Sequence, residues 1–482
     1  MKKSFEIGIS RAANNGKGVG TAPDGKTVFV TGAVPGDRLL VGVTAERSRL
    51  YEAEIREILS PSSFRIPPDC PDLEACGGCC FRQMTYECEL AAKQDFVRDA
   101  FRRIGGVDVD CEPILPSPST EAYRNKAEFA VGTDAEGKLF AGFYSERTHR
   151  VVPVPDCRLT PDEFLKISEN FLKIINLKKN FGLHNINKVS LETVPFDTVR
   201  CLHEPSLTTL YRQTDTRKSF FRHLVLRKSG LTGEIMLIIV AAAEHFPEDK
   251  EIADRIREAF PQVASVILNT NRAAKGSVLG LKNRVLSGAG FIRDRICHVP
   301  VEIGPLSFFQ VNTPAAEKLY QTAAEFADIR PEDTVLDLYC GMGTIGLSMA
   351  AGCHQLIGGE IIPEAVESAR RNAAAMDLEN TRFLCGDAAD VTQTLIREKI
   401  HPDLIVLDPP RRGCSPETLQ AVRTLAPDRI VMVSCDPATA ARDCRILCDA
   451  GYTFTRLRPV DLFPRTKHCE SVIRLIRSDI NS

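Results

Sequence analysis

The sequence lacks three features that would assign the chain to a broad class at once. No run of about 18 apolar residues is present, so no helix is expected to cross a membrane. The first residues, Met1-Lys-Lys-Ser-Phe-Glu, lack the apolar core of a signal peptide, which favours a cytoplasmic location. Neither sign of charge dominates, and the net charge of −2 argues against indiscriminate binding to nucleic acid.

Cysteine, in contrast, is abundant. The chain has 17 cysteines, an odd and high number, and in a cytoplasmic protein this favours a metal site, a cluster or catalysis over a disulfide framework. Six of them stand in mixed apolar contexts and are predicted to be small buried residues: Cys201, Cys297, Cys353, Cys385, Cys444 and Cys448.

The length of 482 residues suits about three domains, and the pattern of the chain changes twice. Residues 1–60 contain short apolar runs separated by turns such as Asp24-Gly25, which predict a small β-barrel. Residues 61–290 begin with a Pro/Ser-rich linker and then mix strand-like runs with an amphipathic helix, as in an α+β domain. Residues 291–482 alternate strand and helix, which predicts an α/β domain with a mostly parallel sheet.

The strands predicted in residues 291–482 end in polar or reactive residues, namely Tyr339, Glu360, Asp387, Asp408 and Cys435. Because parallel strands share one direction, these side chains are expected at one edge of the sheet, where ligands bind. Glu360 follows the glycines of the first strand's loop by about twenty residues, a spacing that suits a carboxylate bound to ribose hydroxyls. The glycine loop alone also fits an NAD-binding domain, and the acids alone fit helix capping.

A second group of reactive residues lies near the start of the predicted α+β domain. Cys70, Cys76 and Cys79 are too closely spaced for simple packing, and Gly77-Gly78 lets the chain turn sharply around a metal ion or cluster. Three thiolates need a fourth ligand, and Cys80 and Cys88 are nearby candidates. Four thiolates bind structural zinc as well as an iron–sulfur cluster, so the spacing alone leaves both open.

Five motifs in residues 305–476 resemble those of the RNA uracil-C5 methyltransferase family. They are Phe308-Phe-Gln-Val-Asn, Leu338-Tyr-Cys-Gly-Met-Gly-Thr, Asp408-Pro-Pro-Arg-Arg-Gly, Val433-Ser-Cys-Asp-Pro-Ala-Thr and His468-Cys-Glu-Ser-Val, and Tyr123-Arg-Asn-Lys upstream also fits. The resemblance implies a Rossmann-like methyltransferase domain over 291–482. It also implies that S-adenosylmethionine is bound by Gln310, Tyr339, Thr344, Glu360, Asp387 and Asp408.

The same resemblance assigns the chemistry to Cys435 and Glu470. Carbon 5 of uracil is a poor nucleophile, but adding a thiolate to carbon 6 makes an enolate that accepts a methyl group at carbon 5. The thiol pKa, ordinarily about 8.5, is therefore expected to be lowered by its surroundings. Glu470 resembles the family base that removes the carbon 5 proton. It opens an apolar run, and an antiparallel strand beginning there would place it at the same sheet edge as Cys435.

The N-terminal half resembles one branch of that family. Residues 1–60 are similar to the TRAM domain, an OB-like RNA-binding module, in Gly16-Lys-Gly-Val-Gly and Val34-Pro-Gly-Asp-Arg. Cys157 resembles the fourth cysteine of the rRNA-directed branch, which carries a [4Fe–4S] cluster. These features favour 23S rRNA over the tRNA T loop as the target. A TRAM-containing radical methylthiotransferase is a third interpretation. Its cysteines are spaced Cys-x3-Cys-x2-Cys, however, whereas five residues separate Cys70 from Cys76 in this chain. A binding module without turnover is disfavoured by Cys435 and Glu470.

Two stretches of the predicted α+β domain combine cations with aromatic rings. Residues 211–228 and 272–295 are strongly basic and contain Phe220, Phe221 and Phe291. Single-stranded RNA is held by such mixtures, so both stretches are predicted to contact RNA. The alternative is a solvated surface above core phenylalanines. A monomer that binds RNA and no membrane is expected.

Overall fold

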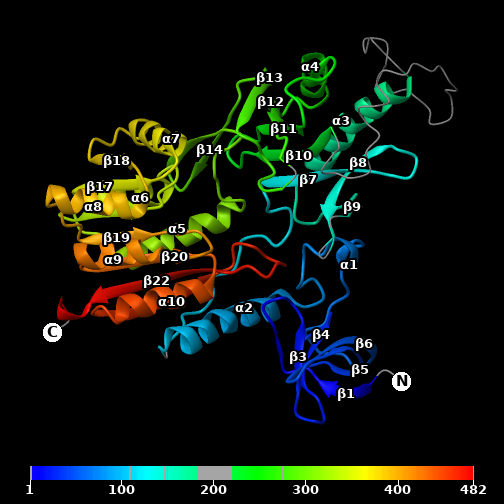
Figure 1. The fold of residues 1–482 in the computed structure, drawn as a ribbon, viewed down its shortest axis with the longest axis horizontal. Helices are drawn as coiled ribbons and strands as arrows, with labels where there is room; N and C mark the ends of the chain where they lie inside the picture. The colour runs from blue at the N-terminus through cyan, green and yellow to red at the C-terminus, as the bar shows by residue number, and fades with distance from the viewer. Residues whose placement is uncertain are drawn as a thin grey trace.

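The computed structural model describes residues 3–107, 110–145, 148, 150–181, 220–273 and 275–480. In these ranges the chain forms one six-stranded sheet, two seven-stranded sheets and a two-stranded hairpin (Figure 1). No helix there has both the length and the apolar composition needed to cross a membrane. Residues 211–219 of the first basic stretch, and Cys201, lie outside the described residues.

The six-stranded sheet is formed by the first part of the chain. Its strands are β1 (Ser4–Gly8), β2 (Arg11–Ala12), β3 (Gly18–Thr21), β4 (Thr27–Thr31), β5 (Arg38–Glu46) and β6 (Leu50–Ser60), in the order β1-β5-β6-β4-β3-β2. Alternate residues such as Val28, Val30 and Tyr51 form its core. A side chain at Gly20 would have its Cβ 2.4 Å from the Gly8 carbonyl oxygen, so only glycine lets these strands approach.

The second sheet follows a helical segment of α1 (Leu73–Cys76), α2 (Tyr86–Ala100) and a π-helical turn over Phe101–Gly105. Its strands are β7 (Lys126–Thr133), β8 (Leu139–Tyr144), β9 (Val151–Pro153), β10 (Phe221–Lys228), β11 (Ile235–Ala241), β12 (Val263–Thr270) and β13 (Lys282–Gly288), in the order β13-β12-β11-β10-β7-β8-β9. Helices α3 (Asp162–Phe181) and α4 (Asp249–Ala259) pack on it. The central strand β11 is buried throughout, which explains its unbroken apolar sequence.

The hairpin of β14 (Ile292–Ile296) and β15 (Val299–Ile303) leads through α5 (Thr313–Ala327) into the third sheet. This sheet has β16 (Thr334–Leu338), β17 (Gln355–Glu360), β18 (Thr381–Cys385), β19 (Leu404–Leu407), β20 (Arg429–Ser434), β21 (Tyr452–Val460) and β22 (Glu470–Arg477), in the order β18-β17-β16-β19-β20-β22-β21. Strand β22 runs antiparallel to both of its neighbours, β20 and β21. The connecting helices are α6 (Thr344–Met349), α7 (Pro363–Ala374), α8 (Ala388–Glu398), α9 (Pro416–Leu425) and α10 (Pro437–Cys448), and short 3-10 turns cover Ala350–Gly352 and Ser478–Ile480.

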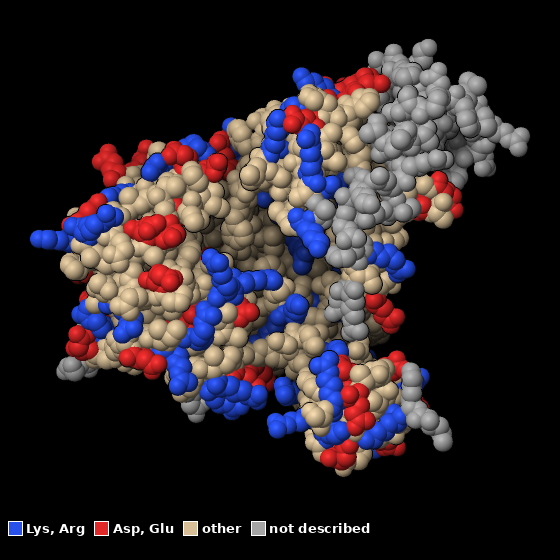
Figure 2. Space-filling model, viewed as in Figure 1, with Lys and Arg blue, Asp and Glu red and all other residues tan. Residues whose placement is uncertain are grey.

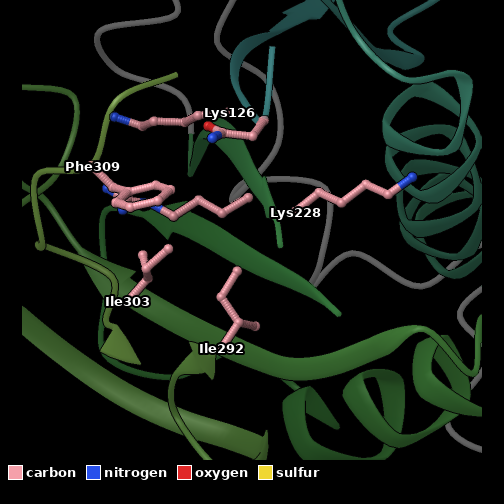
Figure 3. Close-up of a pocket in the computed structure, with 7 residues that line it drawn as sticks. Lys126, Lys228, Ile292, Ile303 and Phe309 are labelled. Carbon is pink, nitrogen blue, oxygen red and sulfur yellow. The ribbon is translucent and has the colours of Figure 1, made fainter. Parts of the chain in front are cut away.

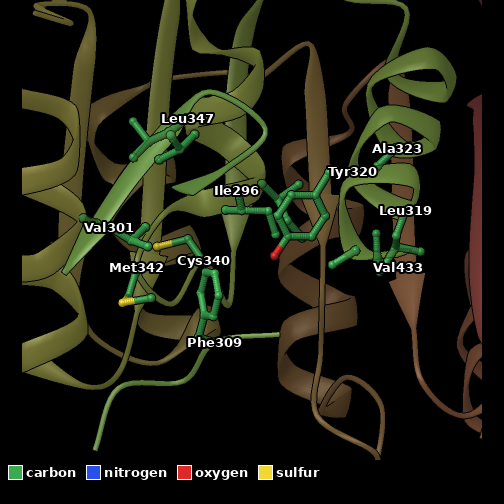
Figure 4. Close-up of a cluster of buried hydrophobic side chains, with 14 of the residues drawn as sticks. Ile296, Val301, Phe309, Leu319, Tyr320, Ala323, Cys340, Met342, Leu347 and Val433 are labelled. Carbon is green, nitrogen blue, oxygen red and sulfur yellow. The ribbon is translucent and has the colours of Figure 1, made fainter. Parts of the chain in front are cut away.

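One apolar cluster joins the second and third sheets. It includes Met236 of the second sheet, Val301 of the hairpin and Val433 of the third sheet. Figure 4 shows part of this cluster, with Tyr320 entering it from α5. Because the hairpin contributes to both sides, the two sheets share a continuous core and hold a fixed relation to each other.

A buried ionic network ties α2 to the loop that precedes β22. Lys93 lies 2.7 Å from both Glu89 and Asp461, and all three side chains are fully buried. Tyr86 donates to Asp461 at 2.8 Å, and Arg465 pairs with Glu89 at 3.4 Å. The backbone N–H of Cys80 donates to the Arg465 carbonyl at 2.9 Å. The cysteine-bearing segment therefore holds the loop that leads into Glu470.

Replacing Lys93 with methionine is expected to destabilise the fold by about 3–5 kcal/mol, because two buried carboxylates would lose their shared cation. Thermal unfolding monitored by circular dichroism measures this loss. Arg98→Met on the same helix is the matched control, since the exposed Arg98–Asp95 pair is worth about 0–1 kcal/mol. Equal melting temperatures for the two variants would contradict the role given to Lys93.

Candidate active site

Cys435 and Glu470 meet at the edge of the third sheet. Strand β20 ends one residue before Cys435, and β22 begins at Glu470. Ser434 and Ser471 are opposite each other in this antiparallel pair, so Cys435 and Glu470 are next beyond them. The antiparallel strand predicted from the sequence is confirmed. Asp436 then starts α10 by accepting hydrogen bonds from two backbone N–H groups of its first turn, each at 3.0 Å.

Three acidic groups at this sheet edge have raised pKa values. Burial, and then the Glu470 carboxylate, raise the pKa of the Cys435 thiol to about 11, although the Arg411 guanidinium opposes them. Burial also raises the pKa of Glu470 to about 8, with Asp408 as a second cause. The pKa of Asp408 itself is raised by burial to about 7. The expected lowering of the thiol pKa is therefore wrong, because burial beside carboxylates disfavours a thiolate.

Arg411 and His468 also lie at this edge of the sheet, and neither was among the predicted site residues. The Nη2 atom of Arg411 lies 3.2 Å from Nδ1 and 3.3 Å from Nε2 of His468. Burial first, and then Arg411, lower the pKa of His468 to about 4, so its ring is neutral near pH 7. Arg411 belongs to the same motif as Asp408, and His468 to the same motif as Glu470. Their positions in these motifs could have indicated that they lie at the site.

The glycine loop after β16 is shaped to leave room for a ligand. Tyr339 and Gly341 both have positive φ, 64° and 56°, and a Cβ added at Gly341 would meet no atom within 4 Å. Glu360 at the end of β17 accepts hydrogen bonds from the backbone of Gly341 at 3.1 Å and of Ile362 at 2.9 Å. The acid and the glycine loop are thus held together.

Asp337, on the strand β16 that leads into this loop, is a further acid that was not predicted from the sequence. Its Oδ2 accepts the Gly346 N–H at 2.9 Å, while its Oδ1 is buried without a hydrogen-bond partner. Burial raises the pKa of Asp337 to about 7, with Asp408 and Glu360 as further causes. A polar ligand at the loop would relieve such a group, so these residues fit a cationic nucleoside cofactor.

The other predicted cofactor residues have definite partners. The hydroxyl of Thr344 lies 3.0 Å from that of Tyr320, and the Tyr339 hydroxyl donates to Thr418 on α9 at 3.3 Å. Asp387 caps α8 by accepting the Asp390 N–H at 2.9 Å, so helix capping is at least one of its roles. The Gln310 carbonyl accepts a hydrogen bond from Asn125 at 2.8 Å. Tyr339, Glu360, Asp387, Asp408 and Cys435 all follow parallel strands at one sheet edge, as predicted.

The four predicted cluster cysteines come from two distant segments. Burial raises the pKa of Cys70, Cys76 and Cys79, and in each case the charge of Cys157 contributes to the increase. Arg158, next to Cys157, donates to the carbonyl of Asp69, next to Cys70, at 3.4 Å, so the two segments lie side by side, whereas Cys88 packs in an apolar cluster. Within the described ranges, however, no three His, Cys, Asp or Glu side chains are arranged as ligands of a metal ion.

One cysteine prediction fails outside these sites. Cys385 is exposed, although it was expected to be buried. The reason is its position, because it is the last residue of the edge strand β18. Cys353 and Cys444 are buried, as predicted, and Cys297 and Cys448 are half-buried.

Comparison with known proteins identifies this arrangement. Residues 248–478 match the family described as tRNA (Uracil-5-)-methyltransferase. A protein of Halalkalibacterium halodurans described as an uncharacterized RNA methyltransferase is 35% identical over 97% of this chain and 95% of its own length. A protein of Caldanaerobacter subterraneus subsp. tengcongensis with the same description is 35% identical over 98% of this chain and 97% of its own length. The chain belongs to the RNA uracil-5-methyltransferase family.

A solved structure shares the fold of the enzyme. The crystal structure of Pyrococcus abyssi tRNA (uracil-54, C5)-methyltransferase in complex with S-adenosyl-L-homocysteine covers 98% of this chain and 100% of that chain, with a TM-score of 0.71. At 24% sequence identity, this likeness is one of fold. The predicted α/β methyltransferase fold is confirmed, and the enzyme is an S-adenosylmethionine-dependent RNA methyltransferase.

Proposed function

We propose that this methyltransferase methylates carbon 5 of a uridine in 23S rRNA through a covalent bond between Cys435 and carbon 6 of the base. The proposed chemistry rests on one observation: Cys435 and Glu470 lie opposite each other, at the end of β20 and the start of β22. A nucleophile and a base at one sheet edge suit a reaction that needs addition at one carbon and proton removal at the next.

Cys435, Arg411 and Glu470 each have a role in that reaction. The Cys435 sulfur adds to carbon 6 as a thiolate, and Arg411, which lowers the thiol pKa, stabilises its negative charge. S-adenosylmethionine, when bound, supplies an electrophilic methyl group for carbon 5. Glu470 then removes the proton from carbon 5, after which the carbon–sulfur bond breaks and the Cys435 sulfur leaves. With its pKa raised to about 8, Glu470 is a stronger base than an ordinary carboxylate.

The cysteine set of the N-terminal half favours 23S rRNA as the target. Residues 4–60 form a separate six-stranded sheet, consistent with the TRAM-like module, and the segment of Cys157 contacts that of Cys70. The tRNA T loop is a second candidate. It is favoured by the fold, because the tRNA (uracil-54, C5)-methyltransferase of Pyrococcus abyssi matches the chain over 98% of its length. An N-terminal sheet of this kind therefore does not distinguish the two targets.

Methylation of purified RNAs tests the target. We expect transfer of a labelled methyl group to 23S rRNA fragments, at a uridine in a loop or flipped out of its stack, because a paired base shields carbons 5 and 6. A tRNA transcript should be a poor substrate. Efficient labelling of the tRNA T loop, with every rRNA fragment inert, would assign the enzyme to the second target.

We also propose that Cys70, Cys76, Cys79 and Cys157 hold a [4Fe–4S] cluster. The contact between the segments of Cys157 and Cys70, through the hydrogen bond from Arg158 to the Asp69 carbonyl, supports this ligand set. Enzyme purified without oxygen should be brown and contain about four iron and four sulfide ions per chain. Cys157→Ser should lose the colour, and Cys88→Ser, the control, should keep it. Stoichiometric zinc instead of iron would contradict the assignment.

A further inference from the structure

A small pocket between the second sheet and the β14–β15 hairpin contains an arginine without a partner. The pocket is lined by Asn125, Lys126, Arg227, Lys228, Ile292, Ile303 and Phe309 (Figure 3). Arg227 is only 6% exposed, and its Nε atom is buried with no hydrogen-bond partner. No hydrogen bond or ion pair of its guanidinium is found among the described residues. Burying a guanidinium without a partner costs free energy of folding, which suggests that Arg227 is kept for a function.

The other cations of the pocket are neutralised. Lys126 pairs with Glu128 at 2.5 Å, and Lys228 pairs with Glu163 of α3 at 3.0 Å. In Figure 3 the Lys228 ammonium accordingly points away from Ile292, Ile303 and Phe309. Arg227 stands directly opposite Lys126 in the antiparallel pair of β10 and β7, where two like charges repel. Glu128 acts on Arg227 only through its charge, and burial lowers the pKa of Arg227 to about 10.

The pocket adjoins the segment that leads to the methyltransferase domain. Asn125 donates to the Gln310 carbonyl at 2.8 Å and to the Thr313 hydroxyl at 2.9 Å, and Phe309 forms part of the wall. Ile292 and Ile303, opposite each other in the hairpin, close the apolar side. Figure 2 shows a hollow between the methyltransferase domain and the second sheet, with Lys and Arg side chains around it. An RNA strand lying in this hollow would bring its phosphates close to the Lys and Arg side chains around it.

We propose that Arg227 binds a backbone phosphate of the RNA substrate at the mouth of this pocket, because the interior has room for about one water molecule only. A guanidinium presents paired N–H donors that match two phosphate oxygens, and its apolar surroundings strengthen such a contact. The arginine is thus kept unpaired in the free enzyme and acquires its partner when RNA binds. The proposal rests on RNA being the substrate of the family, and it is independent of whether the target is rRNA or tRNA.

The test compares Arg227→Met, Arg227→Lys and the control Arg255→Gln, which removes a charge from α4 outside the pocket. Affinity for a short, labelled single-stranded RNA of mixed sequence is measured at several salt concentrations. S-adenosylhomocysteine affinity is measured by calorimetry. For Arg227→Met we expect about tenfold weaker RNA binding and a salt slope reduced by about 0.7, the value for one lost phosphate contact to a single strand. Arg227→Lys should keep the slope, and Arg255→Gln should match the wild type.

Stability separates this proposal from a structural role. Because Arg227 is buried without a partner, Arg227→Met should melt at the wild-type temperature or above it in the absence of RNA. A markedly lower melting temperature would show that the arginine holds the fold, and would overturn the proposal. So would an unchanged salt slope in Arg227→Met. Weaker S-adenosylhomocysteine binding with an unchanged slope would assign the pocket to the cofactor carboxylate instead.

Discussion

Replacing Cys435 with alanine is expected to abolish methyl transfer while leaving cofactor binding nearly intact. Without the sulfur, carbon 5 of uracil is not activated, and loss of a covalent nucleophile reduces turnover by about 10⁴-fold or more. The glycine loop, Glu360 and Asp337 do not depend on the thiol for their hydrogen bonds, so the cofactor site should persist. Transfer of a tritiated methyl group to RNA measures turnover, and calorimetry with S-adenosylhomocysteine measures binding.

The control for this variant is Cys448→Ala. Cys448 lies at the opposite end of α10 from Cys435 and is also half-buried, so its loss tests for a general effect of removing a thiol. This control should retain wild-type activity. Residual turnover of Cys435→Ala within about tenfold of the wild type would remove the thiol from the covalent role.

The positions of the site residues were largely predictable because they depend on local patterns. Strand β17 ends at Glu360, as predicted, and the strands ending before Asp408 and Cys435 lie side by side in the sheet. Parallel strands bring their carboxyl ends to one edge whatever the details of packing, so the sequence pattern sufficed. The position of Glu470 was predictable for a similar reason. It follows once the last apolar run pairs antiparallel with the strand that ends before Cys435.

The electrostatic properties of the site were not predictable, because they come from contacts between distant segments. The pKa of Cys435 is raised by burial and by Glu470, which lies 35 residues along the chain, and it is lowered by Arg411, which follows another strand. The network around Lys93 joins residues more than 300 positions apart, as its bond to Asp461 shows. Neither periodicity nor motif spacing carries information about such pairings, and the unpartnered Arg227 is recognisable only from its neighbours in space.

Replacing Glu470 with glutamine is expected to trap the reaction after methyl transfer. Glutamine has nearly the same shape but is not a base, so the carbon 5 proton stays and the bond from Cys435 to carbon 6 is not released. Cys435 itself is unchanged, and the neutral amide removes one of the charges that raise its pKa, so addition should proceed. A protein–RNA complex that survives denaturing electrophoresis should accumulate, and turnover should fall by about 10²–10⁴-fold.

The pH dependence gives an independent measure of this role. The pKa of Glu470 is raised to about 8, so the fraction in the basic form falls as the pH decreases below that value. Wild-type turnover should therefore rise between about pH 6 and pH 8, whereas release from the Glu470→Gln adduct should lack this dependence. Glu417→Gln, the same change at an exposed residue of α9, is the control and should form no stable complex. A folded Glu470→Gln enzyme that turns over without a trapped complex would identify another group as the base.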